Sequence, residues 1–140
     1  MFSAKAHYGL KAVIYLAKMA GKGPVQAKEI ASSQNVPVRY LELLLSQLKK
    51  ARIINSNRGK LGGYFLGEQA SSIKVYDIII ALEGQISFIS SHEIKENDPI
   101  EMVVADYWNS AQDLLIRSLQ QTGIEELLQK ADSDEQMYYI

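Results

Sequence analysis

Residues 27–66 restrict the folds open to this chain more than any other segment, because three local patterns follow one another there. Residues 27–33 favour a short amphipathic helix, and residues 34–36 have turn character. A second amphipathic helix is expected over residues 37–51. Two short helices joined by so tight a connection predict a helix-turn-helix unit. The inward positions of the second helix are Leu41, Leu44, Leu45 and Leu48.

Directly after the second helix, the sequence predicts a β-hairpin. Residues 53–57 and 64–66 have the composition of two short strands, and residues 58–63 between them hold three glycines and two cations. A basic, glycine-rich hairpin behind a helix-turn-helix unit is typical of a winged helix. The expected fold class is therefore mainly α with a small β-hairpin wing.

Further helices are expected on both sides of this unit. Ser3 is a suitable N-cap for a helix that reaches about Ala20, and residues 75–82 read as a short, very apolar helix ended by Gly84. Asp98 and Pro99 then form a strong start signal, a cap followed by a proline at the first helical position. The helix that follows is expected to reach Gln121, a length of roughly 30 Å.

This long C-terminal helix carries an apolar stripe that lies outside the N-terminal core. Such a stripe needs a second surface, and another copy of the chain would supply it. We therefore expect the helix to mediate homodimerisation. The positions expected in the dimer contact are Val103, Val104, Tyr107, Trp108, Ala111, Leu114 and Leu115.

The C-terminal end predicts one more helix and an unusual tail. Thr122 and Glu125 have the spacing of a capping box for a helix over residues 124–131. Residues 132–136 are acidic and polar, which indicates a flexible lead-in, yet residues 137–140 are apolar or aromatic. Because chain ends usually fray, this ending suits either docking on a partner or packing back onto the dimer.

Charge divides the chain into two halves that the net charge of −1 hides. Residues 1–67 carry eleven Lys and Arg against two acidic residues, a balance of +9, and residues 68–140 carry four against fourteen, a balance of −10. This asymmetry favours a polyanionic partner for the first half; a chance dipole with solvated faces is the alternative. We expect a winged helix-turn-helix DNA-binding region over 1–67 and a dimerisation and effector or partner region over 68–140.

The residue types argue against catalysis, metal binding and membrane insertion. The chain has no cysteine, which excludes disulfides, a catalytic thiol and cysteine-ligated metal centres. His7 and His92 lie in separate predicted elements, and neither has a metal-binding partner at i+4. A weaker alternative is a sensor with ligands from His92, Glu93 or Asp98. We predict no enzyme, no cofactor and a cytoplasmic location, and the longest apolar run, residues 12–17, predicts no membrane span.

Double-stranded DNA is the partner that best fits the first half. Arg39 and Tyr40 start the second helix of the pair, where such helices reach base edges in the major groove. Glu42 either accepts a hydrogen bond from cytosine N4 or is a surface charge favoured by the helix N-terminus. Arg58 in the wing suits a narrow minor groove. The expected DNA-binding set also includes Lys5, Lys28, Lys49 and Lys60, and for Lys49 a helix C-terminal charge is the alternative.

Short motifs along nearly the whole chain occur in an order that resembles a known family. They are Ala4-Lys5 through Tyr8-Gly9-Leu10, Lys28-Glu29-Ile30-Ala31, Tyr40-Leu41-Glu42, Leu48-Lys49-Lys50-Ala51, Arg58-Gly59 with Gly62-Gly63-Tyr64, and Asp77-Ile78 with Leu82-Glu83-Gly84. On these motifs the chain resembles the Rrf2 family of bacterial transcription regulators. The resemblance implies a homodimer on pseudo-palindromic promoter DNA. It also implies that Arg39, Tyr40 and Glu42 lie in the major groove and that Arg58 enters the minor groove.

The chain departs from the cluster-binding members of that family. Those members carry three cysteines in the loop after the Leu-Glu-Gly element, which is residues 87–102 here, and a ligating histidine where Ala105 stands. The usual iron–sulfur ligands are therefore missing, and a signal would reach this chain without a cluster. Leu43 stands where those members have glutamine, which predicts a different DNA sequence preference.

The missing cysteines and the chain ending resemble the branch of the family that represses cysteine metabolism. In that branch the chain also ends in Tyr-Ile, as Tyr139-Ile140 does here. The resemblance implies that the terminal isoleucine carboxylate docks in the active site of cysteine synthase. We therefore predict a homodimeric repressor that senses a protein partner or a small ligand. The alternative is an interaction protein that inhibits a biosynthetic enzyme through its tail and has little role on DNA.

Overall fold

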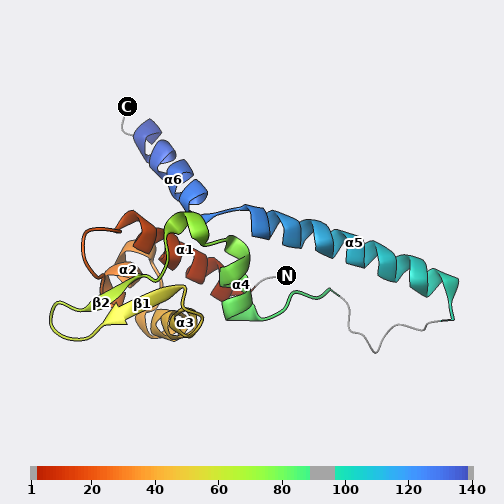
Figure 1. Cartoon of the computed structure of the whole chain (residues 1–140), viewed down its shortest axis with the longest axis horizontal. Coiled ribbons are helices and arrows are strands. Elements are labelled where there is room, and N and C mark those ends of the chain that lie inside the picture. Colours follow the sequence, from red (N-terminus) through yellow and green to blue (C-terminus); the bar gives the residue numbers. More distant parts are fainter. Residues whose placement is uncertain (1–2, 89–96, 139–140) are drawn as a thin grey trace.

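The computed structural model describes residues 3–88 and 97–138 of the chain (Figure 1). Helices dominate it, and one antiparallel hairpin interrupts them, which confirms the predicted fold class. In chain order the elements are α1 (Ala4–Lys18), α2 (Ala27–Gln34), α3 (Val38–Lys50), β1 (Ile54–Asn57), β2 (Gly63–Leu66), the 3-10 helix η1 (Ala70–Ser72), α4 (Val75–Glu83), α5 (Pro99–Gln121) and α6 (Ile124–Tyr138).

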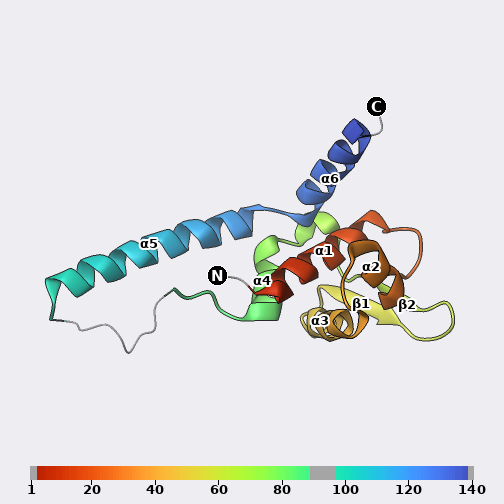
Figure 2. The same cartoon turned by 180° about the vertical axis from the view of Figure 1, so that it is seen from behind.

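Helix α1 lies at the centre of the hydrophobic core. Figure 2 shows it between α4 on one side and α2 on the other, and it also contacts α3, β2 and α6. Val13 in the middle of the helix is fully buried. Gly9 lets α4 come close, because a Cβ atom at this position would lie only 2.2 Å from Cδ1 of Leu82. The side of α1 that carries Gly9 and Val13 therefore lies at the centre of the core.

The core continues beyond the predicted boundary at residue 67. Ile73, Ile78 and Leu82 belong to the same buried cluster as the leucines of α3, and so does Ile124 at the start of α6. The chain also joins these parts through backbone hydrogen bonds, one from Ile124 N to Ile73 O (2.9 Å). The division at residue 67 thus stays a prediction about roles, since the two halves share one core.

The predicted start signals of two helices are confirmed. Ser3 caps α1, where its side-chain oxygen accepts a hydrogen bond from Lys5 N (3.2 Å). Asp98 caps α5 in the same way through Ile100 N (3.0 Å), and Pro99 follows at the first helical position. Helix α4 ends at Gly84, as expected. Helix α1 ends at Lys18, two residues before the predicted Ala20.

The C-terminal end differs from the prediction in two ways. The capping box is wrong: Thr122 ends α5, and its hydroxyl donates to the carbonyl oxygen of Ser118 (2.9 Å) instead of capping α6. The flexible lead-in is wrong as well, since α6 continues from Ile124 through residues 132–136 to Tyr138. Residues 139–140 lie outside the described residues. Packing decides where α6 begins, because Ile124 is fully buried and anchors the first turn of α6 in the core.

Helices α5 and α6 leave the body on the side away from α3. In both views α3 lies at the bottom of the molecule, whereas α5 extends sideways and α6 upward (Figures 1 and 2). Helix α5 has 23 residues, a length of about 35 Å, and one of them, Ala105, is buried. Among the described residues, no helix is long and apolar enough to cross a membrane.

Candidate nucleic-acid interface

Helix α3 separates a fully buried side from a charged, exposed side. Its inner leucines have no solvent exposure, so the helix is fixed firmly against the body. Arg39 and Glu42 are exposed on the outer side, and Lys49 and Lys50 follow in the last turn. The predicted pattern is confirmed, and its consequence is that α3 presents polar groups to solvent on a rigid support. The inner leucines are Leu41, Leu44, Leu45 and Leu48.

A tight turn sets the position of α3 relative to α2. Asn35 ends α2 in the left-handed conformation (φ 55°), a backbone region that asparagine tolerates better than most residues. Val36 is buried, and its N–H donates to Ala31 O (3.0 Å). Pro37 then precedes the first residue of α3 and supplies its cap position. The predicted turn is therefore present and is anchored in the core, but it lies one residue later than expected, because Gln34 is the last residue of α2 and residues 35–37 form the connection.

Helix α2 is fastened to α1 by side chains. The Tyr15 hydroxyl donates to Oε2 of Glu29 (2.7 Å). This hydrogen bond to Glu29 raises the pKa of Tyr15 above its usual value, and burial and the negative charge of Glu29 act in the same direction. At the other end of α2, Nζ of Lys11 donates to the carbonyl oxygen of Gln34. Both contacts hold the helix-turn-helix unit in place without using the outer side of α3.

The wing is a two-stranded hairpin that is also joined to the loop before α2. Its register runs from Ile54 opposite Leu66 to Asn57 opposite Gly63. Val25 pairs with Tyr64 through two backbone hydrogen bonds, from Val25 N to Tyr64 O (2.8 Å) and from Tyr64 N to Val25 O (2.7 Å). The sequence does not predict this additional pairing, because Val25 is a single apolar residue in a loop and a single residue has no strand-like alternation.

Gly63 makes the pairing with Val25 possible. A Cβ atom at Gly63 would lie 2.6 Å from the backbone of Val25, and its φ of 151° is one that residues with side chains rarely adopt. The loop between the strands, residues 58–62, is closed by a hydrogen bond from Gly62 N to Gly59 O (3.0 Å). The loop that carries Arg58 and Lys60 is thus fixed at its base and exposed at its tip.

The predicted cations of α2, α3 and the wing have no acidic partner in the part of the chain that the structure describes. Among the described residues, ion pairs join Lys18 to Glu135 and Lys130 to Glu126, and both lie elsewhere. Lys28, Arg39, Arg58 and Lys60 are exposed. Positive charge on this surface is therefore available to an external anion. Figure 1 shows α3 and the hairpin on the same side of the body.

Two of the predicted DNA contacts also have side-chain partners within the chain, and a third lies apart from the helix-turn-helix unit. Tyr40 is half-buried, and its ring meets that of Tyr8 edge to face with centroids 5.8 Å apart. Lys49 is exposed, but its Nζ donates to Oγ of Ser56 (2.7 Å) and so ties the end of α3 to β1. Lys5 is half-buried in the first turn of α1, outside the helix-turn-helix unit.

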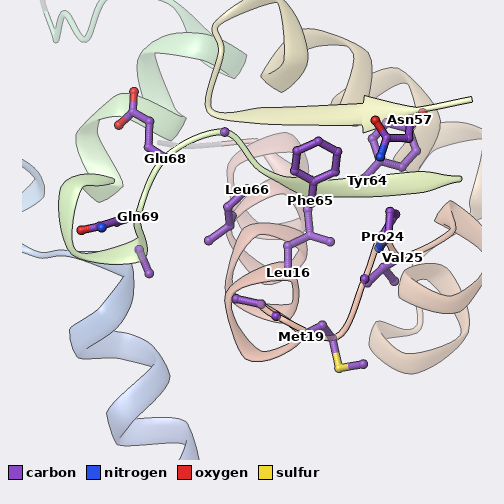
Figure 3. A pocket seen from close by; sticks show the side chains of 15 residues that line it. Leu16, Met19, Pro24, Val25, Asn57, Tyr64, Phe65, Leu66, Glu68 and Gln69 are labelled. Atoms are coloured by element: carbon purple, nitrogen blue, oxygen red, sulfur yellow. The ribbon is translucent and has the colours of Figure 1, made fainter.

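An open pocket lies behind the wing and is lined by no residue of α3. Its volume is about 770 Å³, and it is lined by the end of α1, the loop that follows α1, and β2. Figure 3 shows Leu16 of α1 beside Phe65 and Leu66 of β2, with Met19, the residue after α1, at the lower edge of the view and polar side chains toward the ends of the pocket. The pocket therefore adjoins the base of the wing without forming part of the exposed side of α3.

The donor set for a metal site is sparse. Within the described part of the chain, no three His, Asp or Glu side chains come together, and the sequence contains no cysteine. Of the weaker alternative ligand set, Asp98 is engaged as the cap of α5. His92 and Glu93 lie outside the described residues.

Comparisons with known proteins agree on one group of relatives. A family model described as Rrf2, iron-dependent transcriptional regulator, matches residues 2–130. The chain is 38% identical to the HTH-type transcriptional regulator CymR of Bacillus subtilis (strain 168), over 99% of this chain and 98% of that protein. The solved structure of CymR, the global cysteine regulator of B. subtilis, is similar with a TM-score of 0.82 and 36% identity, over 93% of this chain and 97% of that chain. The structure of T. potens IscR is similar with a TM-score of 0.80 and 34% identity, over 99% of this chain and 96% of that chain.

Proposed function

The chain belongs to the Rrf2 family of transcriptional regulators, and on that basis we propose that it represses transcription as a homodimer on pseudo-palindromic promoter DNA. Its relatives are named transcriptional regulators, so the prediction that it is no enzyme is confirmed. The observation that carries the proposal is the exposed side of α3 and the wing, whose cations have no acidic partner among the described residues. We propose the cytoplasm as its location.

In the proposed complex, α3 lies in the major groove and the wing reaches the minor groove. Arg39, Tyr40 and Glu42 would contact base edges, with Tyr40 braced by Tyr8. Arg58 would enter the minor groove, whose negative potential attracts a guanidinium group. The phosphate contacts are assigned to Lys5, Lys28, Lys49 and Lys60.

The salt dependence of binding tests DNA recognition directly. Each phosphate contact releases counterions, so about six contacts give a log–log slope near −5, at about −0.9 per phosphate. The measurement is fluorescence anisotropy of a labelled duplex, selected from a random library, over a range of KCl concentrations. A slope near zero would contradict DNA binding.

Homodimerisation is proposed through the apolar side of α5. Seven large apolar or aromatic side chains of this helix are 42–75% exposed on a single described chain, including Val103 (69%), Tyr107 (67%) and Leu114 (66%). A continuous apolar patch of this kind typically marks an interaction site in a soluble protein. Of the other predicted contacts, Val104 and Trp108 are also exposed, and Ala111 and Leu115 are half-buried.

We further propose that Tyr139 and Ile140 bind cysteine synthase and link the regulator to cysteine metabolism. The support is the resemblance of the chain ending and the relative described as a global cysteine regulator. Helix α6 leads toward these residues on the side of the body opposite to α3, which leaves the DNA-facing surface free. A regulator that holds DNA and an enzyme on opposite sides could respond to that enzyme.

Deleting Tyr139-Ile140 separates this proposal from the alternative, an interaction protein with little role on DNA. Titration calorimetry with purified cysteine synthase should show binding for the full chain and none for the shortened chain. Anisotropy with the selected duplex should give the same DNA affinity for both. Enzyme binding that survives the deletion would contradict the tail proposal, and enzyme binding without any DNA binding would favour the alternative.

The iron in the family's description does not fit the residues of this chain. Iron–sulfur clusters are held by cysteine thiolates, and this sequence contains none. The described residues also offer no group of three His, Asp or Glu side chains. We therefore propose that the signal acts through a protein partner or a small ligand.

A further inference from the structure

Large apolar side chains are exposed at very few places in the N-terminal region. Among residues 3–67, the exposed large apolar side chains are Val38 (39%), Leu43 (50%) and Leu61 (91%). All three lie in α3 or in the loop of the wing, and none lies on another face of this region. The surface with unpaired cations is therefore also the surface with exposed apolar groups.

Leu43 occupies the middle of the outer side of α3. It follows Arg39 by four residues and therefore lies one helical turn beyond it on the same side. Its neighbour Leu44 faces the core and has no solvent exposure. The core of α3 is complete without Leu43, so its side chain is not required for folding.

The chemistry of the major groove offers one apolar group to such a side chain. The C5-methyl group of thymine lies on the groove surface, and apolar side chains contact it, whereas the other base edges present hydrogen-bonding groups. Arg39 and Glu42, beside Leu43, can make hydrogen bonds. Leu43 has none to make, so its specific contact in this groove is with a methyl group.

We infer that Leu43 contacts a thymine C5-methyl group in the major groove and makes α3 prefer a T·A pair at that position. The inference rests on the proposed function, because it needs α3 to lie in the groove. Leu43 would then supply sequence preference in addition to the contacts of Arg39 and Glu42. Leu61 belongs to the wing and provides a matched control, a second exposed leucine on the same surface that is not on α3.

The test uses the full chain and DNA that differs by a methyl group. A duplex is first selected from a random library, and each thymine of its half-site is then replaced singly by deoxyuridine, which lacks only the C5-methyl group. Anisotropy should show a loss of roughly fourfold in affinity at one position under α3, the equivalent of one buried methyl group. The same scan is repeated with Leu43→Ala, Leu43→Met and Leu61→Ala.

Leu43→Ala should bind the thymine and deoxyuridine duplexes equally at that position. Leu43→Met, which keeps an apolar side chain, and Leu61→Ala should keep the difference. The inference would be overturned if Leu43→Ala and the native chain lost the same affinity on removal of the methyl group. It would also be overturned if the native chain bound a selected duplex tightly and no single replacement by deoxyuridine changed its affinity. If no duplex were enriched from the library, the proposed DNA binding would fail and this inference with it.

Discussion

Helices α3 and α5 are both amphipathic, yet their apolar sides meet opposite environments. In α3 the inner leucines are completely buried, and the polar side faces solvent. In α5 large apolar side chains such as Ile100 (75% exposed) face solvent, and Ala105 is buried. The same helical periodicity therefore fits two different roles. A helix whose apolar side is covered within the chain can offer its polar side to a polyanion, and a helix whose apolar side is uncovered needs a second protein surface.

Charge follows the same division. Residues 1–67 carry a balance of +9 and contain α3, and residues 68–140 carry a balance of −10 and contain α5. Like charges on α5 and DNA disfavour contact between them, so the acidic region is better suited to protein partners. Substitutions in the two regions, with matched controls, test this difference between α3 and α5.

The largest effect is expected for Leu114→Asp on the exposed side of α5. At the proposed symmetric interface each dimer would bury two uncompensated carboxylates, and each costs roughly 3–5 kcal/mol. Sedimentation equilibrium should therefore find a monomer. Asn109→Asp is the control. Asn109 is exposed and lies two residues after Tyr107, which places it on the other side of the helix. If Leu114→Asp stayed dimeric, the apolar side of α5 would not be the interface.

Leu44→Ala in α3 should give the next largest effect, on folding. Deleting most of a fully buried leucine lowers the free energy of unfolding by about 2–5 kcal/mol. Its neighbour Leu43 is half exposed, so Leu43→Ala should cost less than about 1 kcal/mol. Urea denaturation in the Leu114→Asp background removes the contribution of dimerisation. Equal losses at positions 43 and 44 would mean that α3 does not have the buried and exposed sides described above.

Arg58→Ala tests the DNA-facing surface itself. Loss of a guanidinium group in the minor groove should weaken binding by roughly 1–3 kcal/mol. Lys60→Ala, in the same loop, should reduce the magnitude of the salt slope by about one if that lysine contacts a phosphate. Anisotropy over a KCl series measures both. Unchanged affinity in Arg58→Ala would show that the wing does not contribute to binding.

The smallest effect concerns how α2, and with it α3, is held to α1. The Tyr15–Glu29 hydrogen bond is exposed, so Tyr15→Phe should lower stability at pH 7 by about 0.5 kcal/mol. Folding raises the pKa of Tyr15 above its ordinary value near 10. The hydrogen bond therefore stabilises the fold fully below pH 10, and this stabilisation is lost as the pH rises through the pKa that Tyr15 has in the folded protein.

Urea denaturation between pH 7 and 11 measures this contribution. The native chain should lose more stability than Tyr15→Phe between pH 9 and 11, since only the native chain has the titrating phenol at this position. Parallel pH profiles of the two proteins would show that the hydrogen bond does not contribute to stability.

Local signals explain why the helix starts and the hairpin were predicted well. Ser3 and Asp98 cap their helices through the backbone N–H two residues on, so the information lies within a few residues of sequence. The hairpin depends on a run of glycines and on short alternating segments, which are equally local. The leucines of α3 were predicted as core because they repeat with the period of a helix.

Contacts between distant residues explain what was missed. Thr122 had the spacing of a cap, but burial of Ile124 fixed where α6 begins, and the hydroxyl turned back to α5. The pairing of Val25 with Tyr64 joins residues 39 positions apart, and the Tyr8–Tyr40 contact joins residues 32 apart. No local pattern shows whether the Tyr40 side chain is half-buried against another residue or free to contact a base.

Composition and short-range periodicity are enough to predict most of the helices and the hairpin, the division of charge and the absence of thiolate ligands. Which apolar sides are covered depends on the tertiary structure. Periodicity shows that one side of α3 and one side of α5 is apolar, but burial depends on whether another part of the chain reaches that side. For α3 it does, through α1 and α4, and for most of α5 among the described residues it does not.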